Sequence, residues 1–390
     1  MDGLTHSLVG LASAKAGLER LSPYTAACGV LSANAPDIDV VSFLFGGRWT
    51  LLQHHRGITH SVVGALVLGA LVPTILFGIE RAIAGWRKTA PRIRYRGLLL
   101  ASLIAAATHP LMDWTNNYGV RFLLPWNGRW FYGDLVFIVD PYLLLVLGGS
   151  CFLLTSNRRA KILAWSCLAA LITVMVLLAS PQRQATSEAL TLARIIWITG
   201  VVVFAATRLL RLHRRAGRSL AVVSLAFVLL YWGALAWAHA VAYRHAVSEA
   251  KAVAARHGEQ FIRVAAMPTV ANPFRWLCIA ETDRALYRFI VGTDDQMPTG
   301  YPANSPADGA AAVVERFEKP LGQSEQLVVL ATRDSRAQVL LGFARFPIAR
   351  LESDNCIGRT LVQFADLRYT EPGVSRGSFS LSVPVECPAP

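Results

Sequence analysis

Long uncharged runs alternate with short charged segments over roughly the first 240 residues of the chain. A bilayer is crossed by about 20 apolar residues, so these runs predict membrane-spanning helices. Two shorter helical stretches, 4–19 and 23–36, precede them, and the second begins at the helix-start signal Ser22-Pro23. Both are rich in small residues, so we expect them packed inside a helical bundle. The predicted spans are 61–80, 97–112, 135–154, 161–179, 194–210 and 218–241.

The pattern changes after about residue 243. A charged helix-like stretch, YRHAVSEAKAVAARHG, is followed by a turn-rich MPTVANPF. Alternation of apolar and polar residues with a period of two then predicts strands, and one longer segment, SEQLVVLATRDSRAQVLLGFARF, is predicted to be helical for part of its length. The predicted strands are FRWLCIAET, ALYRFIVG, RTLVQFADLRY and GSFSLSVPVE.

Composition and charge agree with a membrane protein. The chain is 54% hydrophobic and 16% charged, which is far from the composition of a typical soluble domain. A net charge of +13 by itself is compatible with nucleic-acid binding, but residues 244–390 carry 16 basic and 16 acidic residues, so the excess lies in residues 1–243. It is concentrated in the loops 81–96, 155–161 and 208–218, whereas the intervening loops 113–134 and 180–194 are nearly neutral. We therefore expect no nucleic-acid partner.

This alternation is the positive-inside pattern, which places the basic loops in the cytoplasm and everything after Tyr243 outside. The predicted fold class is an α-helical polytopic membrane bundle of about six to eight spans, residues 1–243, with a C-terminal extracytoplasmic α+β domain, residues 244–390. The N-terminal stretch has no basic region ahead of its apolar residues, so we do not expect a removable signal peptide. Three cysteines fall in the outer domain and predict one disulfide whose pairing stays open: Cys278, Cys356 and Cys387.

The same orientation brings polar residues of five segments to the outer leaflet. Ionisable groups at a membrane edge are costly unless they are paired or bind a metal. His109 and Asp113 are four residues apart and share a helix face, and Pro36 stiffens the turn that presents Asp37. Each histidine taken singly is more often an ordinary hydrogen-bonded residue, but their joint location favours a metal site. Imidazole and carboxylate are the ligands of a catalytic Zn²⁺, and further carboxylates also allow Mn²⁺ or a second metal.

Four motifs in a fixed order carry a family resemblance: LTHSLVG, NAPDID, HHRGITHS and THPLMDWTNNYG. Together they resemble the membrane-bound metal-dependent hydrolases of the YdjM type, also described as LexA-binding, inner membrane-associated hydrolases, over roughly residues 1–145. The resemblance implies location in a bacterial inner membrane, with Asp39, His54 and Arg56 as close neighbours of the ligands and Asp140 at another family position. The metal ligands it implies are His6, Asp37, His55, His60, His109 and Asp113.

These residues favour metal-assisted hydrolysis of a membrane lipid or lipid-linked ester. A looser similarity to zinc-dependent phospholipases C makes a phosphoester the first choice. Asp39 or His54 is expected to act as the base, and Arg56 is expected to clamp the substrate oxyanion. Asn116 and Asn117 are candidate hydrogen-bond donors near the metal, and Trp114, Trp126 and Trp130 fit an outer aromatic belt. A metal or proton transporter and a non-catalytic scaffold with a structural metal are the alternatives.

Overall fold

The computed structural model describes residues 1–179, 187–212, 216–293, 314–353, 358–374, 377 and 379–387. The chain divides into two compact units, each with its own hydrophobic core. The first unit contains Met1–Ile38, Arg56–Trp237 and Pro268–Pro273, and the second contains Asp39–His55, Ala238–Met267 and Phe274–Pro390. The domain boundary at 243/244 stays a prediction. The two units are not divided at one point of the chain, because residues 39–55 belong to the second unit and residues 268–273 to the first.

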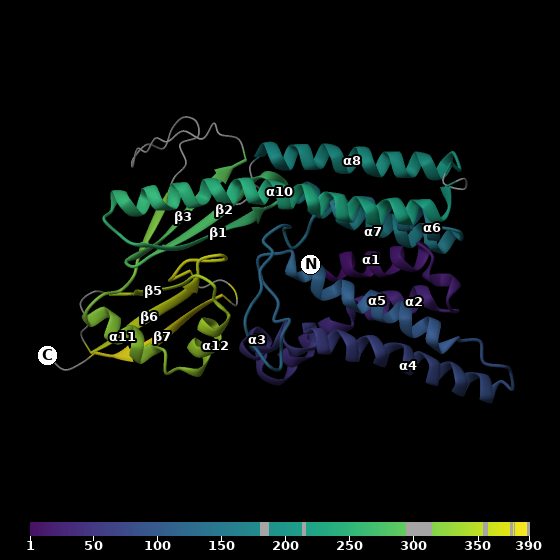
Figure 1. Cartoon of the computed structure of the whole chain (residues 1–390), viewed down its shortest axis with the longest axis horizontal. Helices are drawn as coiled ribbons and strands as arrows, with labels where there is room; N and C mark the ends of the chain where they lie inside the picture. Colours follow the sequence, from purple (N-terminus) through teal and green to yellow (C-terminus); the bar gives the residue numbers. More distant parts are fainter. Residues whose placement is uncertain are drawn as a thin grey trace. The chain divides into compact units, whose positions relative to one another are not determined.

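The first unit is helical (Figure 1). Its bundle packs the helices side by side, with the short α1 and α2 inside, as expected from their small residues. The second unit shares the long helix α10 with it. The helices are α1 (Gly3–Lys15), α2 (Thr25–Asn34), α4 (Val62–Trp86), α5 (Tyr95–Trp114), α6 (Pro141–Thr155), α7 (Arg159–Leu178), α8 (Ser187–Leu209) and α10 (Arg218–Arg256).

Five helical segments of the described residues are long and apolar enough to cross a membrane. Four of them, α4, α7, α8 and α10, match predicted spans to within one residue at the ends that extend beyond the helix. The fifth, Thr25–His54, is not one straight helix: it joins α2, a 3₁₀ helix (Ala35–Ser42) and α3 (Phe43–His54), which is kinked at Gly46 and Gly47. The number of spans in a bilayer stays a prediction.

Two predicted spans differ from the structure. The segment 97–112 is helical within α5, but α5 is not among the five apolar segments. The segment 135–154 is not one helix, because residues 135–140 are non-helical and α6 begins at Pro141. Asp140 caps this start: its Oδ1 accepts the backbone N–H groups of Tyr142 and Leu143, both at 2.9 Å. With 15 residues, α6 is shorter than the roughly 20 residues of an ordinary span.

Close helix contacts hold the short helices in the bundle. A Cβ on Gly10 of α1 would lie 2.4 Å from the backbone oxygen of Gly29 on α2, so glycine is required where these backbones touch. The hydroxyl oxygens of Ser32 and Ser102 are 2.7 Å apart, and Ser102 donates to the carbonyl of Gly69 at 2.6 Å. These bonds link α2, α5 and α4 where the helices are buried. Such hydrogen bonds help helices to associate in lipid, where the hydrophobic effect does not drive them together.

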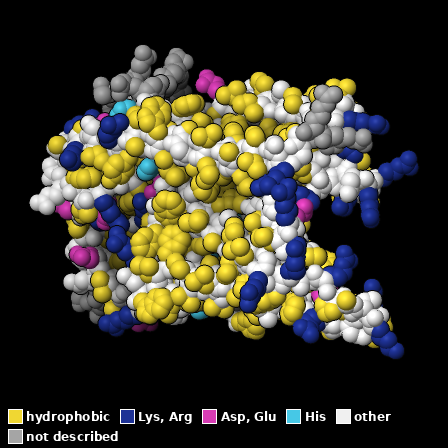
Figure 2. Space-filling model, turned by 45° about the vertical axis from the view of Figure 1, so that its right-hand side comes forward, with side chains coloured by type: hydrophobic (Ala, Val, Ile, Leu, Met, Phe, Trp, Pro, Cys, Tyr) yellow, Lys and Arg dark blue, Asp and Glu magenta, His cyan; other side chains and the backbone are white. Residues whose placement is uncertain are grey.

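Apolar and basic side chains occupy different parts of the helical unit. Figure 2 shows hydrophobic side chains over much of one face, with Lys and Arg gathered at the end of the helices. Exposed basic residues lie in the connections between α4 and α5, α6 and α7, and α8 and α10, or in the first turn of the helix that follows: Arg87, Lys88, Arg92, Arg94, Arg96, Arg158, Arg159, Lys161, Arg211 and Arg218. The apolar surface and its basic edge agree with a membrane protein.

The second unit contains two antiparallel sheets. The first has the order β1 (Phe261–Thr269), β2 (Asn272–Thr282), β3 (Ala285–Gly292) and β4 (Glu315–Glu318), and the second has β5 (Pro347–Leu351), β6 (Arg359–Asp366) and β7 (Ser380–Glu386). Helices α3, α11 (Gln323–Ala331) and α12 (Ser335–Phe343) complete it. One stripe of α10 packs on the first sheet through alanines four residues apart: Ala238, Ala242, Ala246 and Ala250.

The four predicted strands and the predicted helical segment are confirmed, with α11 and α12 in the latter. The predicted turn in MPTVANPF is present at Ala271 (φ 54°), but it is short, because the rest of the segment ends β1 and begins β2. Strand β1 was missed because its inner residues are buried on both faces and do not alternate. The charged stretch after residue 243 continues α10 to Arg256 without a break.

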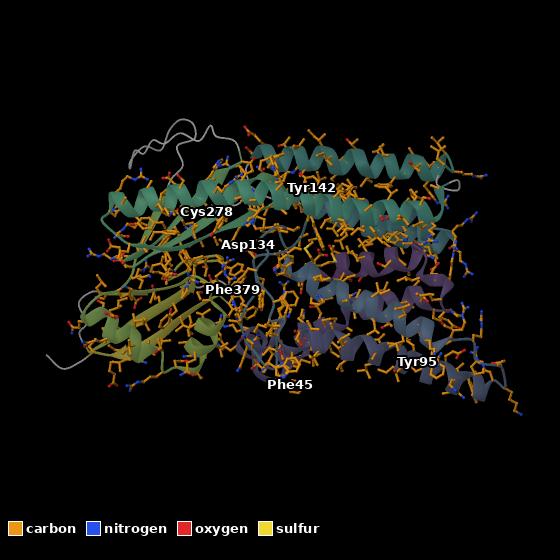
Figure 3. All side chains as sticks on the ribbon, viewed as in Figure 1. Phe45, Tyr95, Asp134, Tyr142, Cys278 and Phe379 are labelled. Atoms are coloured by element: carbon orange, nitrogen blue, oxygen red, sulfur yellow. The ribbon has the colours of Figure 1, made fainter. Side chains whose placement is uncertain are left out.

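The cysteines of the second unit differ in state. Cys278 is buried in the first sheet as a reduced cysteine (Figure 3), whereas Cys387 is disulfide-bonded. Cys356 lies outside the described residues. The prediction of one disulfide therefore holds for Cys387, and Cys278 is the cysteine left over. The extracytoplasmic location of this unit stays a prediction.

Candidate metal centre

The motif HHRGITHS immediately precedes α4 and forms the turn at the start of this helix. Ile58–His60 form a short 3₁₀ turn, and Ser61 caps α4 by accepting the N–H of Gly64 at 3.0 Å. A Cβ on Gly64 would lie 1.9 Å from the carbonyl oxygen of Ile58, so glycine is needed for the turn to fold against the helix start. The close fold buries His60 completely.

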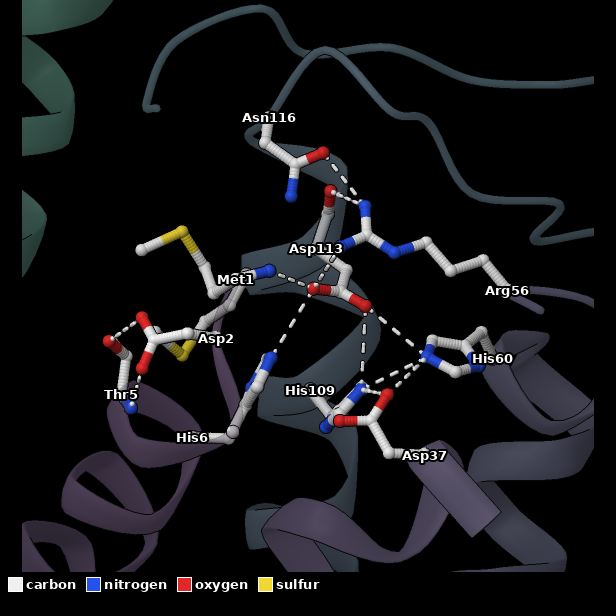
Figure 4. Close-up of polar contacts among 12 residues, drawn as sticks. Met1, Asp2, Thr5, His6, Asp37, Arg56, His60, His109, Asp113 and Asn116 are labelled. Carbon is white, nitrogen blue, oxygen red and sulfur yellow. Dashed lines mark hydrogen bonds and ion pairs between the residues drawn. The ribbon is translucent and has the colours of Figure 1, made fainter. Parts of the chain in front are cut away.

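Three other residues, from two segments, lie beside His60 (Figure 4). His109 and Asp113 lie one turn apart on α5, as their spacing predicts, and both are buried. Asp37 lies in the 3₁₀ helix that follows α2. One ligand atom from each of these four residues lies within 4.8 Å of all the others. The structure therefore gathers four of the six predicted metal ligands in one cluster, which can hold a metal ion.

The spacing of the four ligand atoms matches a single small cation. His60 Nε2 is 3.4 Å from Asp37 Oδ1 and 3.2 Å from Asp113 Oδ2. His109 Nε2 is 3.5 Å from Asp37 Oδ1 and 3.4 Å from Asp113 Oδ2, and the two Nε2 atoms are 3.0 Å apart. Ligands at about 2.0–2.1 Å from a tetrahedral Zn²⁺ are separated by roughly 3.3 Å. The five distances fall around that value.

The tautomer of His109 follows from its second nitrogen. Nδ1 lies 2.6 Å from the carbonyl oxygen of Ala33, which only accepts, so Nδ1 carries the proton and donates. Nε2 of a neutral ring then presents its lone pair to the cluster. A metal-binding histidine is commonly fixed in this way through its other nitrogen. The Nδ1 of His60 contacts the Thr59 hydroxyl at 3.0 Å.

Asp113 is held through its other oxygen. Oδ1 lies 3.1 Å from Nη2 of Arg56, and it also accepts from the amino group of Met1. Arg56 in turn donates through Nη1 to the side chain of Asn116 at 2.7 Å and lies over the ring of Tyr118 at 4.6 Å. Because Arg56 is only 2% exposed, it is anchored to the protein, and its predicted role as a substrate clamp stays a prediction.

His6 lies beside the four residues of the cluster. Its ring stacks on that of His109, with centroids 3.7 Å apart, and its Nε2 is 3.3 Å from Asp113 Oδ1. It therefore faces the opposite oxygen of Asp113 from the one that points to His60. Nδ1 of His6 has no hydrogen-bond partner among the described residues. Its role as a metal ligand stays a prediction.

The remaining predicted residues belong to the second unit. Asp39 and His55 contact each other, with Oδ1 and Nδ1 2.9 Å apart, and His54 is exposed at the end of α3. The catalytic roles of Asp39 and His54 and the ligand role of His55 stay predictions.

Two groups of the site were missed from the sequence because both are backbone atoms. The Ala33 carbonyl and the Met1 amino group are not marked by any sequence motif, although Ala33 immediately precedes NAPDID. Asp140, at another position of the family resemblance, lies at the start of α6. Its carboxylate caps α6 and accepts the Tyr231 hydroxyl at 3.0 Å.

Asp37 gives the cluster its exposed side. Its side chain is 30% exposed, whereas those of His60, His109 and Asp113 are 0–1% exposed. Asp37 is therefore the member of the cluster that an incoming molecule can reach.

Part of this chain is similar in sequence to known proteins. The model of the YdjM inner membrane protein family matches residues 1–183, which include all four cluster residues. The chain is 34% identical to the inner membrane protein YbcI of Escherichia coli over 145 residues, covering 36% of this chain and 78% of that protein. It is 26% identical to the uncharacterized protein YfhP of Bacillus subtilis over 155 residues, covering 37% of this chain and 43% of that protein.

The chain thus spans less than half the length of YfhP. No solved structure gives a significant match. The family match covers the resemblance expected from the four ordered motifs and extends beyond it, through the bundle as far as α7. The protein belongs to the YdjM family of inner membrane proteins.

Proposed function

We propose that this inner membrane protein is a metal-dependent hydrolase of a lipid or lipid-linked ester, with a phosphoester favoured, at the outer leaflet. The observation that carries the proposal is the spacing of the four ligand atoms. Two imidazole nitrogens and two carboxylate oxygens converge at distances suited to one cation. Three of these four groups are buried, and gathering them is costly without such a cation.

The donor set fits Zn²⁺, and its carboxylates also suit Mn²⁺. When bound, such an ion supplies Lewis acidity and a nucleophilic water near neutral pH. The protein supplies the orientation: the Ala33 carbonyl fixes the ring of His109, and Arg56 holds the carboxylate of Asp113. Asp37 lies on the exposed side, where it can bind the ion, position the substrate or accept a proton.

The surroundings of Asp113 favour one ion. Its Oδ2 faces His60 and His109, while its Oδ1 faces the guanidinium of Arg56 and the amino group of Met1. A second cation at Oδ1 would be repelled by these positive groups. We therefore propose that the four-residue cluster holds one ion, with no second ion at Oδ1 of Asp113.

The two ends of α4 and α5 carry different groups, and this difference supports a substrate at the outer leaflet. His60 precedes α4 and Asp113 is near the end of α5, whereas Arg87 follows α4 and Arg94 precedes α5. The basic residues are thus at the other ends of the helices that carry the cluster. With basic connections in the cytoplasm, the cluster lies at the outer leaflet, where a lipid ester can reach it.

A structural metal site is the second candidate function. Four protein ligands fill a tetrahedral Zn²⁺ site, whereas catalytic zinc sites keep a position for water. The two proposals predict different effects of losing the exposed Asp37. In a hydrolase, Asp37 borders the substrate, and its loss removes turnover. In a structural site, its loss lowers stability alone.

Metal analysis of the detergent-purified full chain tests the proposal. We expect one Zn²⁺ or Mn²⁺ per chain, lost in His60→Ala and His109→Ala and retained in the control His54→Ala, which alters an exposed histidine outside the cluster. Hydrolysis of a panel of long-chain phospholipids should disappear in the two metal-free variants. No metal in folded wild type after addition of Zn²⁺ or Mn²⁺ would exclude the metal centre. Metal without turnover on any lipid ester would favour the structural site.

A further inference from the structure

An apolar slot lies inside the helical unit, on the other side of α1 from the metal cluster. Side chains of α1, α6, α7 and α8 line it; its cavity volume is about 150 Å³, and it is partly open to the outside. Its walls include Leu4, Leu8, Phe152, Trp165 and Trp197. Ser166 contributes the one hydroxyl among its lining side chains. A space of this kind does not hold ordered water, which needs several polar partners.

The two indole rings turn their polar atoms away from an occupant. Nε1 of Trp165 donates to the Thr155 hydroxyl at 2.8 Å, and Nε1 of Trp197 donates to the Thr173 hydroxyl at 2.9 Å. Neither threonine lines the slot. The rings therefore offer apolar surface to an occupant and no free donor, so the slot does not select a polar molecule.

The slot is elongated along the helices. Its lining runs from Leu144 to Phe152 on α6 and from Trp197 to Ala205 on α8, which at 1.5 Å per residue is about 12 Å on each helix. An apolar slot of that length matches a hydrocarbon chain better than a compact ring system. Left without an occupant, its walls would lose dispersion contacts that close-packed interiors normally make.

The slot and the metal cluster lie on opposite faces of α1. Leu4 and Leu8 are two residues before and after His6, so they project from the opposite face of the helix. His6 faces Asp113, and the two leucines face the slot. Leu4 also lies in the first turn of α1, so the slot begins at the end of the bundle that carries the cluster.

We infer that this slot binds one hydrocarbon chain of a bilayer lipid and that such long-chain lipids are the substrate class of the metal centre. The inference about substrate rests on the proposed function, whereas chain binding does not. The chain comes from the surrounding bilayer, because α7 and α8 are among the segments that can cross a membrane. A lipid held by its chain keeps its polar head at the end of the bundle where His6 and Asp113 lie.

A glycine in the wall offers a way to fill the slot. A Cβ on Gly148 would meet only the tip of Leu8, at 3.8 Å, so Gly148→Leu is accommodated at its Cβ and extends into the space. Ala169→Phe fills it from α7 as a second variant. Gly78→Leu is the matched control, because Gly78 lies in α4 with nothing within 4 Å of a Cβ.

The test uses the full chain in nanodiscs of phosphatidylethanolamine and phosphatidylglycerol that contain a phosphatidylglycerol with a photoreactive diazirine in its acyl chain. After illumination, mass spectrometry locates the labelled residues. We expect labelling of slot residues such as Phe152, reduced at least fivefold by Gly148→Leu and Ala169→Phe and unchanged by Gly78→Leu. Labelling of the slot no stronger than that of the exposed Leu71 on α4, or unchanged by both filling variants, would overturn the inference.

Two further readouts separate this inference from the proposed function. The metal-free His109→Ala variant should label its slot as wild type does, because chain binding needs no metal. In turnover assays, Gly148→Leu should slow hydrolysis of a long-chain phospholipid at least fivefold and leave that of a soluble dihexanoyl analogue unchanged. Slot labelling without turnover on any lipid would remove the proposed function and leave chain binding intact. Equal slowing of both substrates would overturn the assignment of substrate class.

Discussion

The Nε2 atoms of His60 and His109 lie 3.0 Å apart at the centre of the helical unit's polar cluster. Because Nδ1 of His109 donates to the Ala33 carbonyl, its Nε2 directs a lone pair toward His60. Two ring nitrogens at this separation require a proton or a cation between or beside them, and the carboxylates of Asp37 and Asp113 attract the same positive charge. The arrangement is therefore preformed for a cation.

A preformed site predicts stabilisation by metal. Adding Zn²⁺ to metal-stripped protein at 100 times its Kd should stabilise the fold by about 2.7 kcal/mol, seen as a higher unfolding temperature by tryptophan fluorescence. His109→Ala should abolish the shift, and His54→Ala should retain it. An equal shift in His109→Ala would show that the ion binds elsewhere.

Arg56 is expected to act on stability through Asp113. Arg56→Gln removes the guanidinium that lies 3.1 Å from Asp113 Oδ1 and leaves a buried carboxylate without this partner. Loss of one member of a buried ion pair typically costs about 3–5 kcal/mol. Thermal unfolding in detergent measures the change. Arg129→Gln is the control, because Arg129 is exposed and lies over Phe131, and similar losses in both variants would contradict the anchoring role of Arg56.

The start of α4 is expected to be sensitive to a single methyl group. In Gly64→Ala the new Cβ would overlap the Ile58 carbonyl and the turn that carries His60 must move. A backbone displacement of this kind costs about 1–3 kcal/mol, and we expect reduced metal content. Gly78→Ala, at an open helical position, should be neutral or slightly stabilising. Metal analysis beside thermal unfolding measures both effects, and full metal content in Gly64→Ala would show that the close approach is dispensable.

A pH dependence is expected in the second unit at Glu259. Burial raises the pKa of its carboxyl, but hydrogen bonds from Thr282, Arg316 and Tyr287 and the charge of Arg316 outweigh burial, so the pKa lies below the usual 4.5. A lowered folded-state pKa stabilises the fold above pH 4.5, and this stabilisation is lost as the pH falls through the folded-state value.

The unfolding temperature between pH 3 and 7 tests this dependence. Glu259→Gln should be less stable than wild type near pH 7, and the difference should shrink as the pH falls below 4.5. Glu352→Gln, at an exposed position, should follow the wild-type curve. A constant difference between Glu259→Gln and wild type across the range would contradict the prediction.

Local patterns in the sequence predicted most of the helices and strands. Four apolar segments and the four predicted strands were recognisable because hydropathy and period-two alternation act over a few neighbouring residues. The failures have local causes as well. Asp140 stops α6 from extending backwards by capping it, and β1 is buried on both faces and therefore shows no alternation.

The sequence by itself determined which residues carry the candidate chemistry, because the spacing of His109 and Asp113 and the motifs around Asp37 and His60 are local properties of the chain. Only the tertiary structure decided what each group touches. Arg56 is turned toward Asp113, and His6 stacks on His109. These contacts join residues more than 50 positions apart, and they depend on how closely helices pack, which hydropathy and spacing do not encode.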